Sequence, residues 1–467
     1  MTIERLSPQD STFLHIEDRV SHMHIASVAV FEGPEPPFEQ IVAMIRSKLP
    51  LVPRYRQVVR WVPLQLGRPV WVDDVHFDRD YHLRHTALPA PGGDDELRNL
   101  VGRVMSQQLD RTRPLWEIWV VQGLDDDRWA LLSKTHHCMV DGVSGTDVLG
   151  LVLDATPDAV PAPAPPWRPR AEPTPIDLAG RSVRELVRSP YEQARAVRAA
   201  TRVPRRAVSQ LSEVLRGLRG LTALMVPMPT STLNGPIGPN RRWGWASTTV
   251  EDIKRIRKDT GATFNDVLLA ATARGFRDLL QARGESVDRV VRTLVPVSVR
   301  PRDASGKAIG DGTFENRVSA MFAELPVSSD DPIERLRLVS AQMAGLKESK
   351  QAVAGEALTS LSGFAPPMLL AAGMRLSARL PQRAVNTVTT NVPGPQTSLY
   401  AAGRRMVAAY PYVPLAGQVR IGVAMFSYDG VVNFGVTGDY DSVPDIDVLC
   451  QGIADGMDAM LERVGAP

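Results

Sequence analysis

Cysteines, long apolar runs and a charge imbalance are all scarce in this sequence. Its 467 residues include only two cysteines, Cys138 and Cys450, which excludes a disulfide scaffold and is typical of a reducing compartment. There is no stretch of about 18 apolar residues, so we expect no segment to span a bilayer. The formal net charge is only +2, and this balance gives no reason to expect a nucleic acid as partner.

The N-terminal sequence also lacks a feature, namely the apolar core of a signal peptide. It reads MTIERLSPQDSTFLHIED, with charges scattered throughout, so export by that route is not expected and we predict a cytoplasmic protein. The chain is too long for one ordinary core and fits about two domains of roughly 200 residues each. Nothing in the sequence predicts the oligomeric state.

Periodic patterns ahead of residue 155 indicate both strands and a helix. HIASVAVFEG, residues 24–33, alternates apolar and polar residues as a strand does, and residues 94–109 have helical spacing with acidic residues at their start. WEIWVVQGL and RWALLSKTHH flank the turn Asp125–Asp127 and predict a hairpin. The first part of the chain is therefore expected to combine a sheet with helices.

The second part shows the same mixture. ATFNDVLLAATARGFRDLL predicts a helix, RVVRTLVPVSVR and VRIGVAMFSYDG predict strands, and a closing helix is expected from about Asp445. Between the two parts, Thr156–Pro175 is too rich in proline for a helix interior or a central strand. We therefore predict an α/β protein with an N-terminal half at 1–155, a linker and helical crossover at 156–236, and a C-terminal half at 237–467.

The segment Arg181–Arg219 is basic, with ten arginines and three glutamates spaced among apolar residues as on an amphipathic helix. One interpretation is a solvated helical crossover packed on the two halves. The other is a surface helix that rests on anionic lipid or an oil-water interface. Pro190 and Pro204 interrupt the helix under either interpretation.

Two adjacent histidines, His136 and His137, end the second strand of the predicted hairpin, in LLSKTHHCMVDGVSG. Neighbouring side chains on a strand point to opposite faces, so the pair does not form a shared metal site, and no further Cys or His follows at ligand spacing. Two structural histidines in the core are one alternative. The Asp141-Gly142 pair that follows favours a functional site instead, because it places polar groups at the end of an element.

The sequence HHCMVDG matches the HHxxxDG motif of the CoA-dependent acyltransferases, the superfamily of chloramphenicol acetyltransferase. With the further motifs, the whole chain resembles the bacterial bifunctional wax ester synthase/diacylglycerol acyltransferase family. Glu315 departs from the pattern, since a small residue is expected before Asn316. The further motifs are LSPQDSTFLHIED, Pro114-Leu115-Trp116, LNGPIGPNRR at 233–242, Asn265-Asp266, PVSVR at 296–300 and NVPGP at 391–395.

The resemblance implies a fold and a set of site residues. The fold is α/β, with two chloramphenicol acetyltransferase-like domains, each a mixed sheet with helices, and an active-site tunnel at their interface. His137 is implied as general base and His136 as its support, while Asp141 is structural and pairs with Arg300. The remaining implied residues are Gly142 in the motif, Asn265 as oxyanion donor or orienter, and a substrate-binding set: Pro114, Leu115, Trp116, Asp266, Asn391, Pro393 and Gly394.

The proposed base fits the chemistry of ester formation. A neutral imidazole, with an ordinary pKa of about 6.5, takes the proton of an alcohol that attacks a thioester carbonyl. A covalent route through Cys138 is disfavoured, because on a strand that side chain faces away from His137 and nothing nearby lowers its pKa. GVSG at 142–145 is not a GxSxG elbow, and GDG at 310–312 is not a dinucleotide fingerprint.

The resulting hypothesis is an acyltransferase that moves a long-chain acyl group from acyl-CoA to diacylglycerol, or to a long-chain alcohol to give a wax ester. No cofactor and no metal are expected beyond acyl-CoA as co-substrate. Two alternatives stay open: a non-catalytic lipid-droplet or membrane-associated protein on the same scaffold, and an acyltransferase with a natural-product acceptor. For the hypotheses that involve lipid, we consider a cytoplasmic protein that can bind peripherally to the inner membrane or to lipid droplets.

Overall fold

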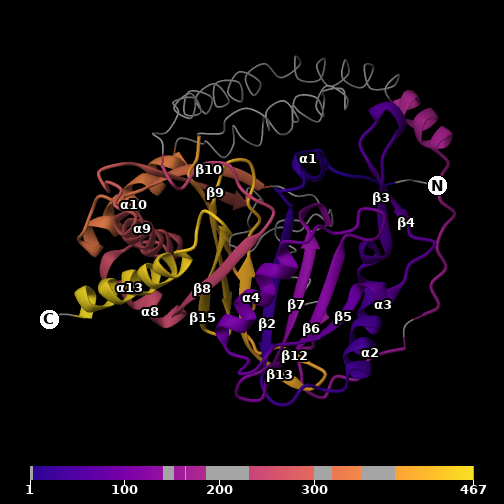
Figure 1. Ribbon diagram of the computed structural model, residues 1–467, viewed down its shortest axis with the longest axis horizontal. Coiled ribbons are helices and arrows are strands. Elements are labelled where there is room, and N and C mark those ends of the chain that lie inside the picture. The colour runs from indigo at the N-terminus through magenta and orange to yellow at the C-terminus, as the bar shows by residue number, and fades with distance from the viewer. Residues whose placement is uncertain are drawn as a thin grey trace, which may run out of the picture.

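The computed structural model describes residues 4–139, 152–163, 165–185, 231–298, 318–348 and 384–465. Two six-stranded sheets and a small three-stranded sheet form its framework, with helices against them (Figure 1). The implied mixed α/β architecture is confirmed. Asp141, Gly142, Arg300 and Glu315 lie outside the described residues, as do most of Arg181–Arg219, GVSG and GDG.

The first large sheet has the strand order β12-β13-β2-β7-β6-β5. The hairpin predicted around Asp125–Asp127 is confirmed, because β6 and β7 pair antiparallel. Two strands that lie late in the sequence complete this sheet, since β13 pairs with β2. The predicted boundaries at 155–156 and 236–237 stay a prediction. Because β12 and β13 belong to the C-terminal half of the sequence, this sheet joins the predicted N-terminal and C-terminal halves. The bounds are β2 His24–Phe31, β5 Leu83–Ala87, β6 Trp116–Leu124, β7 Arg128–His136, β12 Tyr400–Ala401 and β13 Arg404–Tyr412.

The second large sheet has the order β10-β9-β11-β14-β15-β8 and mixes parallel with antiparallel pairs. Its central strand β14 is buried along its whole length, which explains its nearly unbroken apolar sequence. The strands predicted from RVVRTLVPVSVR and VRIGVAMFSYDG are confirmed as β9 and β14. The bounds are β8 Arg241–Thr249, β9 Val291–Ser298, β10 Val318–Leu325, β11 Thr387–Val392, β14 Ile421–Tyr428 and β15 Val431–Asp439.

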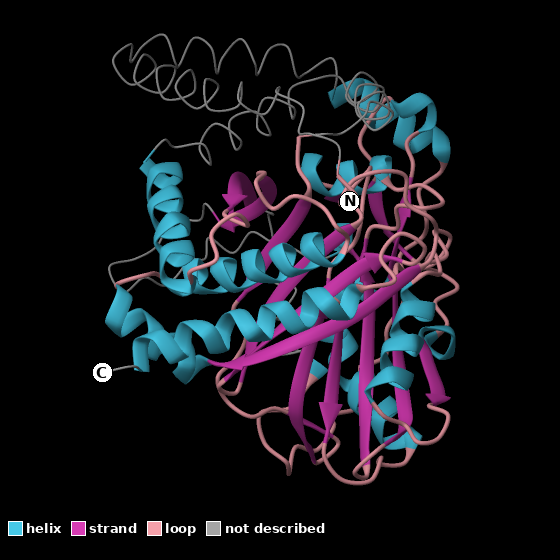
Figure 2. Ribbon diagram, turned by 60° about the vertical axis from the view of Figure 1, so that its left-hand side comes forward, coloured by secondary structure: helices cyan, strands magenta, loops and turns pink. Residues whose placement is uncertain are grey.

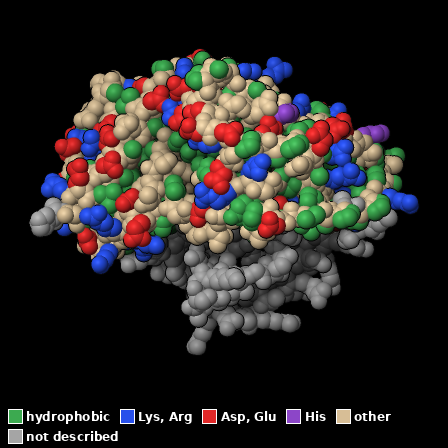
Figure 3. Space-filling view, turned by 90° about the horizontal axis from the view of Figure 1, so that it is seen from below, with side chains coloured by type: hydrophobic (Ala, Val, Ile, Leu, Met, Phe, Trp, Pro, Cys, Tyr) green, Lys and Arg blue, Asp and Glu red, His purple; other side chains and the backbone are tan. Residues whose placement is uncertain are grey.

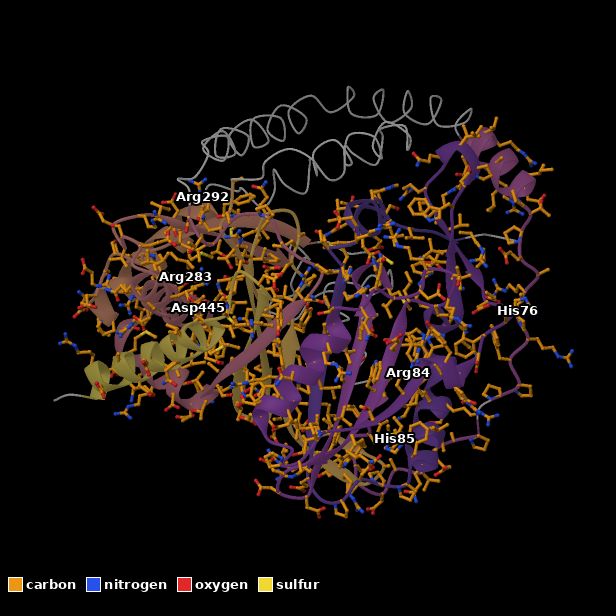
Figure 4. The ribbon with its side chains drawn as sticks, in the orientation of Figure 1. His76, Arg84, His85, Arg283, Arg292 and Asp445 are labelled. Carbon is orange, nitrogen blue, oxygen red and sulfur yellow. The ribbon has the colours of Figure 1, made fainter. Side chains whose placement is uncertain are left out.

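Among the described residues, four helices pack with the second sheet, and the two longest run side by side across it (Figure 2). Both of these helices were predicted from sequence. Arg283 at the end of α9 is paired with Asp445 just ahead of α13, with Nε 2.7 Å from Oδ2 (Figure 4). This pair fixes the ends of the two helices to each other. The bounds are α8 Val250–Thr260, α9 Phe264–Ala282, α10 Pro332–Glu348 and α13 Ile446–Gly465.

The helix predicted at 94–109 ends earlier than predicted: α4 spans Asp94–Met105. Buried Lys134 on β7 donates to the carbonyl oxygens of Val104, at 2.8 Å, and Gln107. An ammonium group at the carboxyl end of a helix satisfies carbonyls that have no helical partner and interacts favourably with the helix dipole. The side chain of Lys134 thereby stabilises the end of α4.

The small sheet, in the order β1-β4-β3, lies beside the first large sheet (Figure 1). Its members are β1 Glu4–Arg5, β3 Gln57–Arg60 and β4 Val70–Asp73. The described part of the proline-rich segment contains no helix or strand before residue 175, as its composition predicts, and Trp167 lies under the guanidinium of Arg56. Residues 175–185 are helical and place Leu178 in a cluster with Val58 of β3.

Three further α-helices lie in the described N-terminal residues, and one of them contacts the turn that carries His137. Helix α1, Pro8–Ile16, begins after the cap residue Ser7, whose Oγ accepts a hydrogen bond from the N–H of Asp10. It packs on a single turn of 3-10 helix, η4, His137–Met139, which follows β7. The other helices are α2 Phe38–Lys48 and α3 Arg79–His82.

Candidate active site

The two adjacent histidines belong to different elements. His136 is the last residue of β7, and His137 is the first residue of η4. The strand was predicted to continue through His137 and Cys138. This was wrong, because the chain turns into a 3-10 conformation directly after His136. The N–H of His137 donates to the carbonyl oxygen of Met23 at 2.8 Å, which anchors the turn to the segment ahead of β2.

His137 is half-buried and packs face to face with an aromatic ring. Its ring centroid lies 4.0 Å from that of Phe13 on α1, with an interplanar angle of 18°. Burial, assisted by the neighbouring His136, lowers the pKa of His137 to about 4. Its Nδ1 has no hydrogen-bond partner among the described residues. The imidazole is therefore neutral at pH 7, the state in which a histidine accepts a proton.

His136 is fully buried and faces a buried carboxylate. Its Nε2 lies 3.4 Å from Oε2 of Glu17, and its Nδ1 accepts a hydrogen bond from the N–H of Cys138 at 3.1 Å. Because Nδ1 is an acceptor, the N–H of the ring is assigned to Nε2, the atom nearest Glu17. His136 thus supports the turn that carries His137.

Glu17 is the centre of a buried polar cluster. Its Oε1 lies 3.3 Å from Nε2 of His24, and its Oε2 accepts hydrogen bonds from Arg111, with Nε at 2.9 Å. Burial alone would raise the pKa of Glu17, but hydrogen bonds and charge interactions with His136 and His24 hold that pKa well below its usual range. Glu17 is therefore ionised at neutral pH.

The cluster resembles a metal site in composition but not in arrangement. Burial lowers the pKa of His24 to about 3, and its Nε2 also accepts from the N–H of Leu109 at 3.4 Å. Within the described part of the chain, no group of three or more His, Cys, Asp or Glu side chains has an arrangement that could hold a metal ion. His24 and His136 instead lie beside Glu17, with their Nε2 atoms 3.3 and 3.4 Å from its carboxylate oxygens.

Cys138 is unsuited to nucleophilic attack. Its side chain is 4% exposed, and burial raises the pKa of its thiol well above the ordinary value. A thiol is reactive as the thiolate, and no cation near Cys138 overcomes this effect within the described residues. The structure thus supports the earlier conclusion that Cys138 is not an acyl carrier, although its position in η4 differs from the expected strand.

The Pro114-Leu115-Trp116 motif lies in the core. Leu115 and Trp116 are each 1% exposed. The carbonyl oxygen of Leu115 accepts the N–H of His136 at 2.9 Å, and Nε1 of Trp116 donates to the carbonyl oxygen of Tyr55 at 2.8 Å. These contacts hold the end of β7, the strand that carries His136, in place. The substrate-binding role of the motif stays a prediction.

Asn265 and Asp266 occupy the first turn of α9. Asn265 is half-buried, whereas Asp266 is buried and closes a capping box in which its Oδ2 accepts the N–H of Thr263 at 2.9 Å. Ser340 of α10 also donates to Oδ2 of Asp266, at 3.1 Å. Asp266 thus stabilises the start of the helix that carries Asn265, and the oxyanion role of Asn265 stays a prediction.

The NVPGP motif spans the end of β11 and the turn after it. Asn391 lies on β11 opposite Met425 of β14, and Pro393 is exposed. Gly394 is hydrogen-bonded through its N–H to Oγ of Ser427 at 3.1 Å. A Cβ atom at this position would lie 2.2 Å from the carbonyl oxygen of Ser427, so only glycine fits the close approach of the two chain segments.

Comparison with known proteins places the chain in a family. The family model described as the wax ester synthase/diacylglycerol acyltransferase catalytic domain matches residues 6–268, and the WS/DGAT C-terminal domain matches residues 314–461. The chain belongs to the wax ester synthase/diacylglycerol acyltransferase family. The resemblance drawn from the sequence motifs is therefore confirmed, and the first match includes both histidines, α1 and the Asn265-Asp266 pair.

Relatives within this family are similar over nearly the whole chain. A protein of Mycobacterium tuberculosis named as a probable diacylglycerol O-acyltransferase is 37% identical over 458 residues, 97% of this chain and 95% of its own length. A second protein of that organism, also named as a diacylglycerol O-acyltransferase, is 31% identical over 473 residues, covering 99% and 90%.

Solved structures show the same fold. The wax ester synthase/diacylglycerol acyltransferase of Marinobacter aquaeolei VT8 superposes with a TM-score of 0.69 at 25% identity, covering 99% of this chain and all of that one. The first condensation domain of the calcium-dependent antibiotic synthetase superposes with a TM-score of 0.61 at 17% identity, covering 100% and 97%. The second likeness extends the fold to enzymes that share little sequence with this chain.

Phe13, Glu17, His24 and Arg111 are site residues that reasoning from local patterns missed. Phe13 and Glu17 lie in the LSPQDSTFLHIED motif, which had carried only family information. The helical spacing of four residues between them was a usable signal, because it places both side chains on one face. Nothing in the local sequence indicates that this face lies against η4.

Proposed function

We propose that this protein transfers a long-chain acyl group from acyl-CoA to the hydroxyl of diacylglycerol, with long-chain alcohols as second acceptors. The observation that carries the proposal is His137, a neutral imidazole held in a fixed orientation at the start of η4 in a chain of this family. The names of the mycobacterial relatives, both diacylglycerol O-acyltransferases, favour diacylglycerol as acceptor.

The proposed reaction proceeds by direct attack. His137 takes the proton from the acceptor hydroxyl as its oxygen forms a bond to the thioester carbonyl carbon, and the carbonyl oxygen becomes an oxyanion. Asn265 is proposed either to donate a hydrogen bond to that oxyanion or to orient another group that does so. The carbon–sulfur bond then breaks, and the proton on His137 passes to the CoA thiolate. The low pKa of His137 favours this return of the proton.

An assay with competing acceptors tests the proposed function. Purified protein receives one labelled long-chain acyl-CoA together with equal amounts of diacylglycerol, monoacylglycerol and hexadecanol. We expect triacylglycerol as the main product and wax ester as the second. If no ester forms from any of the three, the lipid acyltransferase proposal is wrong.

The finer proposal is that the protein works at a lipid surface. Within the described residues, no helix is both long and apolar enough to cross a membrane. The loop between β3 and β4 exposes Trp61, 40% accessible, and Leu64, 80% accessible, and the φ of Leu64 is +54°, which is unusual for a bulky side chain. The ring of Trp61 lies 5.1 Å from that of His15, on the helix that covers His137.

This placement favours the loop as a contact with lipid. Diacylglycerol is insoluble, so it reaches an enzyme from a membrane or droplet, and exposed Trp and Leu side chains favour insertion at such an interface. Acidic and basic side chains are interspersed on the face shown in Figure 3. Apolar contact through Trp61 and Leu64 is proposed as the main attraction of the loop, and Arg181–Arg219 as an added basic attraction.

A double substitution tests the lipid contact. Trp61→Ser with Leu64→Ser is expected to weaken binding to phosphatidylcholine vesicles that contain diacylglycerol, and to lower triacylglycerol synthesis on those vesicles, because apolar area is lost from the loop. Co-sedimentation with vesicles measures the binding. Val160→Ser, at a site 87% exposed in the proline-rich segment, is the matched control and should bind as the wild type does. Equal binding by all three proteins would remove the loop from the proposal.

A further inference from the structure

Helix α1 brings two side chains to the two histidines from one of its faces. Phe13 and Glu17 are four residues apart, one turn of helix, and Glu17 is the residue that caps the carboxyl end of α1, its N–H donating to the carbonyl oxygen of Phe13 at 3.2 Å. Phe13 reaches His137, and Glu17 reaches His136. One short helix therefore contacts both members of the motif.

We propose that Glu17 and Phe13 are positioning residues that set the orientation of the His137 imidazole. This inference rests on the proposed function, since it assigns these residues to the same reaction. Phe13 acts directly, because a ring stacked at 4.0 Å restricts rotation of the imidazole and covers one of its faces. Glu17 acts through His136 and the backbone of η4.

The path from Glu17 to His137 runs through the His136 ring. Oε2 of Glu17 lies 3.4 Å from Nε2 of His136, and Nδ1 on the other side of that ring accepts the N–H of Cys138 at 3.1 Å. Cys138 directly follows His137 in η4. A change at Glu17 is thereby transmitted to the turn that carries the base.

The surroundings of Glu17 keep its charge in place. Nε2 of His24 on β2 lies 3.3 Å from Oε1, and Nε2 of His136 on β7 lies 3.4 Å from Oε2. Arg111, in the segment between α4 and β6, donates to Oε2. The ammonium of Lys134, also on β7, adds a further positive charge near these groups. A carboxylate with these partners is a fixed acceptor, which is the property that a positioning residue needs.

Two substitutions at Glu17 separate positioning from simple stability. Glu17→Gln keeps an amide oxygen at the place of Oε2, where it offers an acceptor to His136 and Arg111. Glu17→Leu keeps a similar volume but offers no acceptor. Both variants lose the charge that pairs with Arg111, so they differ chiefly in what they offer His136.

The expected result is a split between these two variants. For Glu17→Leu, kcat should fall roughly 10- to 100-fold with little change in KM for acyl-CoA, the range typical of an outer partner of a functional histidine. Glu17→Gln should keep most of the wild-type kcat, because it still offers His136 an acceptor. The control is Glu285→Gln, which removes a carboxylate paired with Arg289 in the other half and should leave kcat unchanged.

Phe13→Leu provides a second readout through the pH profile. In the wild type, kcat/KM should fall on the acid side only near pH 4, where His137 takes up a proton. Removal of the stacked ring admits water, which raises the pKa of His137 and moves the acid limb toward its ordinary value of about 6.5. A purely structural role for Phe13 would lower the rate without moving the limb.

The inference and the proposed function fail in different ways. A wild type that forms no ester disproves the proposed function, whereas an active wild type with equal kcat in Glu17→Leu and Glu17→Gln overturns the inference. A crystal structure of Glu17→Leu tests positioning without any assay. We expect the His137 ring displaced from its stack on Phe13, and an unchanged ring position would overturn the inference.

Discussion

Replacement of His137 by alanine is expected to lower the rate of ester formation by roughly 10²- to 10⁴-fold, the usual contribution of a general base. The His137 ring packs on Phe13 but belongs to none of the apolar core clusters of the described residues, so the fold should persist. Measurement of kcat with diacylglycerol, together with circular dichroism and the melting temperature, checks both statements.

His136→Ala is the control for this prediction. It removes the partner of Glu17 and the acceptor for the N–H of Cys138, so it should lower kcat, but less than His137→Ala does, because the base itself remains. If His137→Ala keeps more than a few per cent of wild-type activity, His137 is not the base. Equal losses in the two variants at unchanged stability would also contradict the assignment of roles.

Much of the fold was accessible from local patterns. The β6–β7 hairpin, α9, β14 and α13 were predicted because each has a strong period or a continuous apolar run with clear ends. The pairing of β13 with β2 was not accessible, since strands separated by more than 370 residues leave no local signal of their register. The end of α4 depended on Lys134, which comes from another element.

The site divides in the same way. The family motif indicated His137 and His136 directly, but the strand pattern extended too far and missed the turn into η4. The cluster around Glu17 assembles side chains from α1, β2, β7 and the segment before β6, and no spacing along the chain encodes such a meeting. The pairing of Asp141 with Arg300 lies outside the described residues and stays a prediction from the resemblance.

The second large effect concerns the acceptor. Direct attack requires both substrates, so release of CoA thiol should be negligible with acyl-CoA alone and should rise with the addition of diacylglycerol. A covalent route through Cys138 would instead give a burst of thiol without acceptor, because acylation of the protein precedes transfer. Burial of Cys138, which raises the pKa of its thiol, favours the first outcome.

The most direct test of the account is therefore a single-turnover experiment. Protein in excess over a long-chain acyl-CoA is mixed with and without diacylglycerol, free thiol is followed in time, and the mass of the intact protein is measured at each point. Direct transfer by His137 predicts thiol and triacylglycerol appearing together only with diacylglycerol, at an unchanged protein mass. A thiol burst without acceptor, with one acyl group added to the protein, would contradict it.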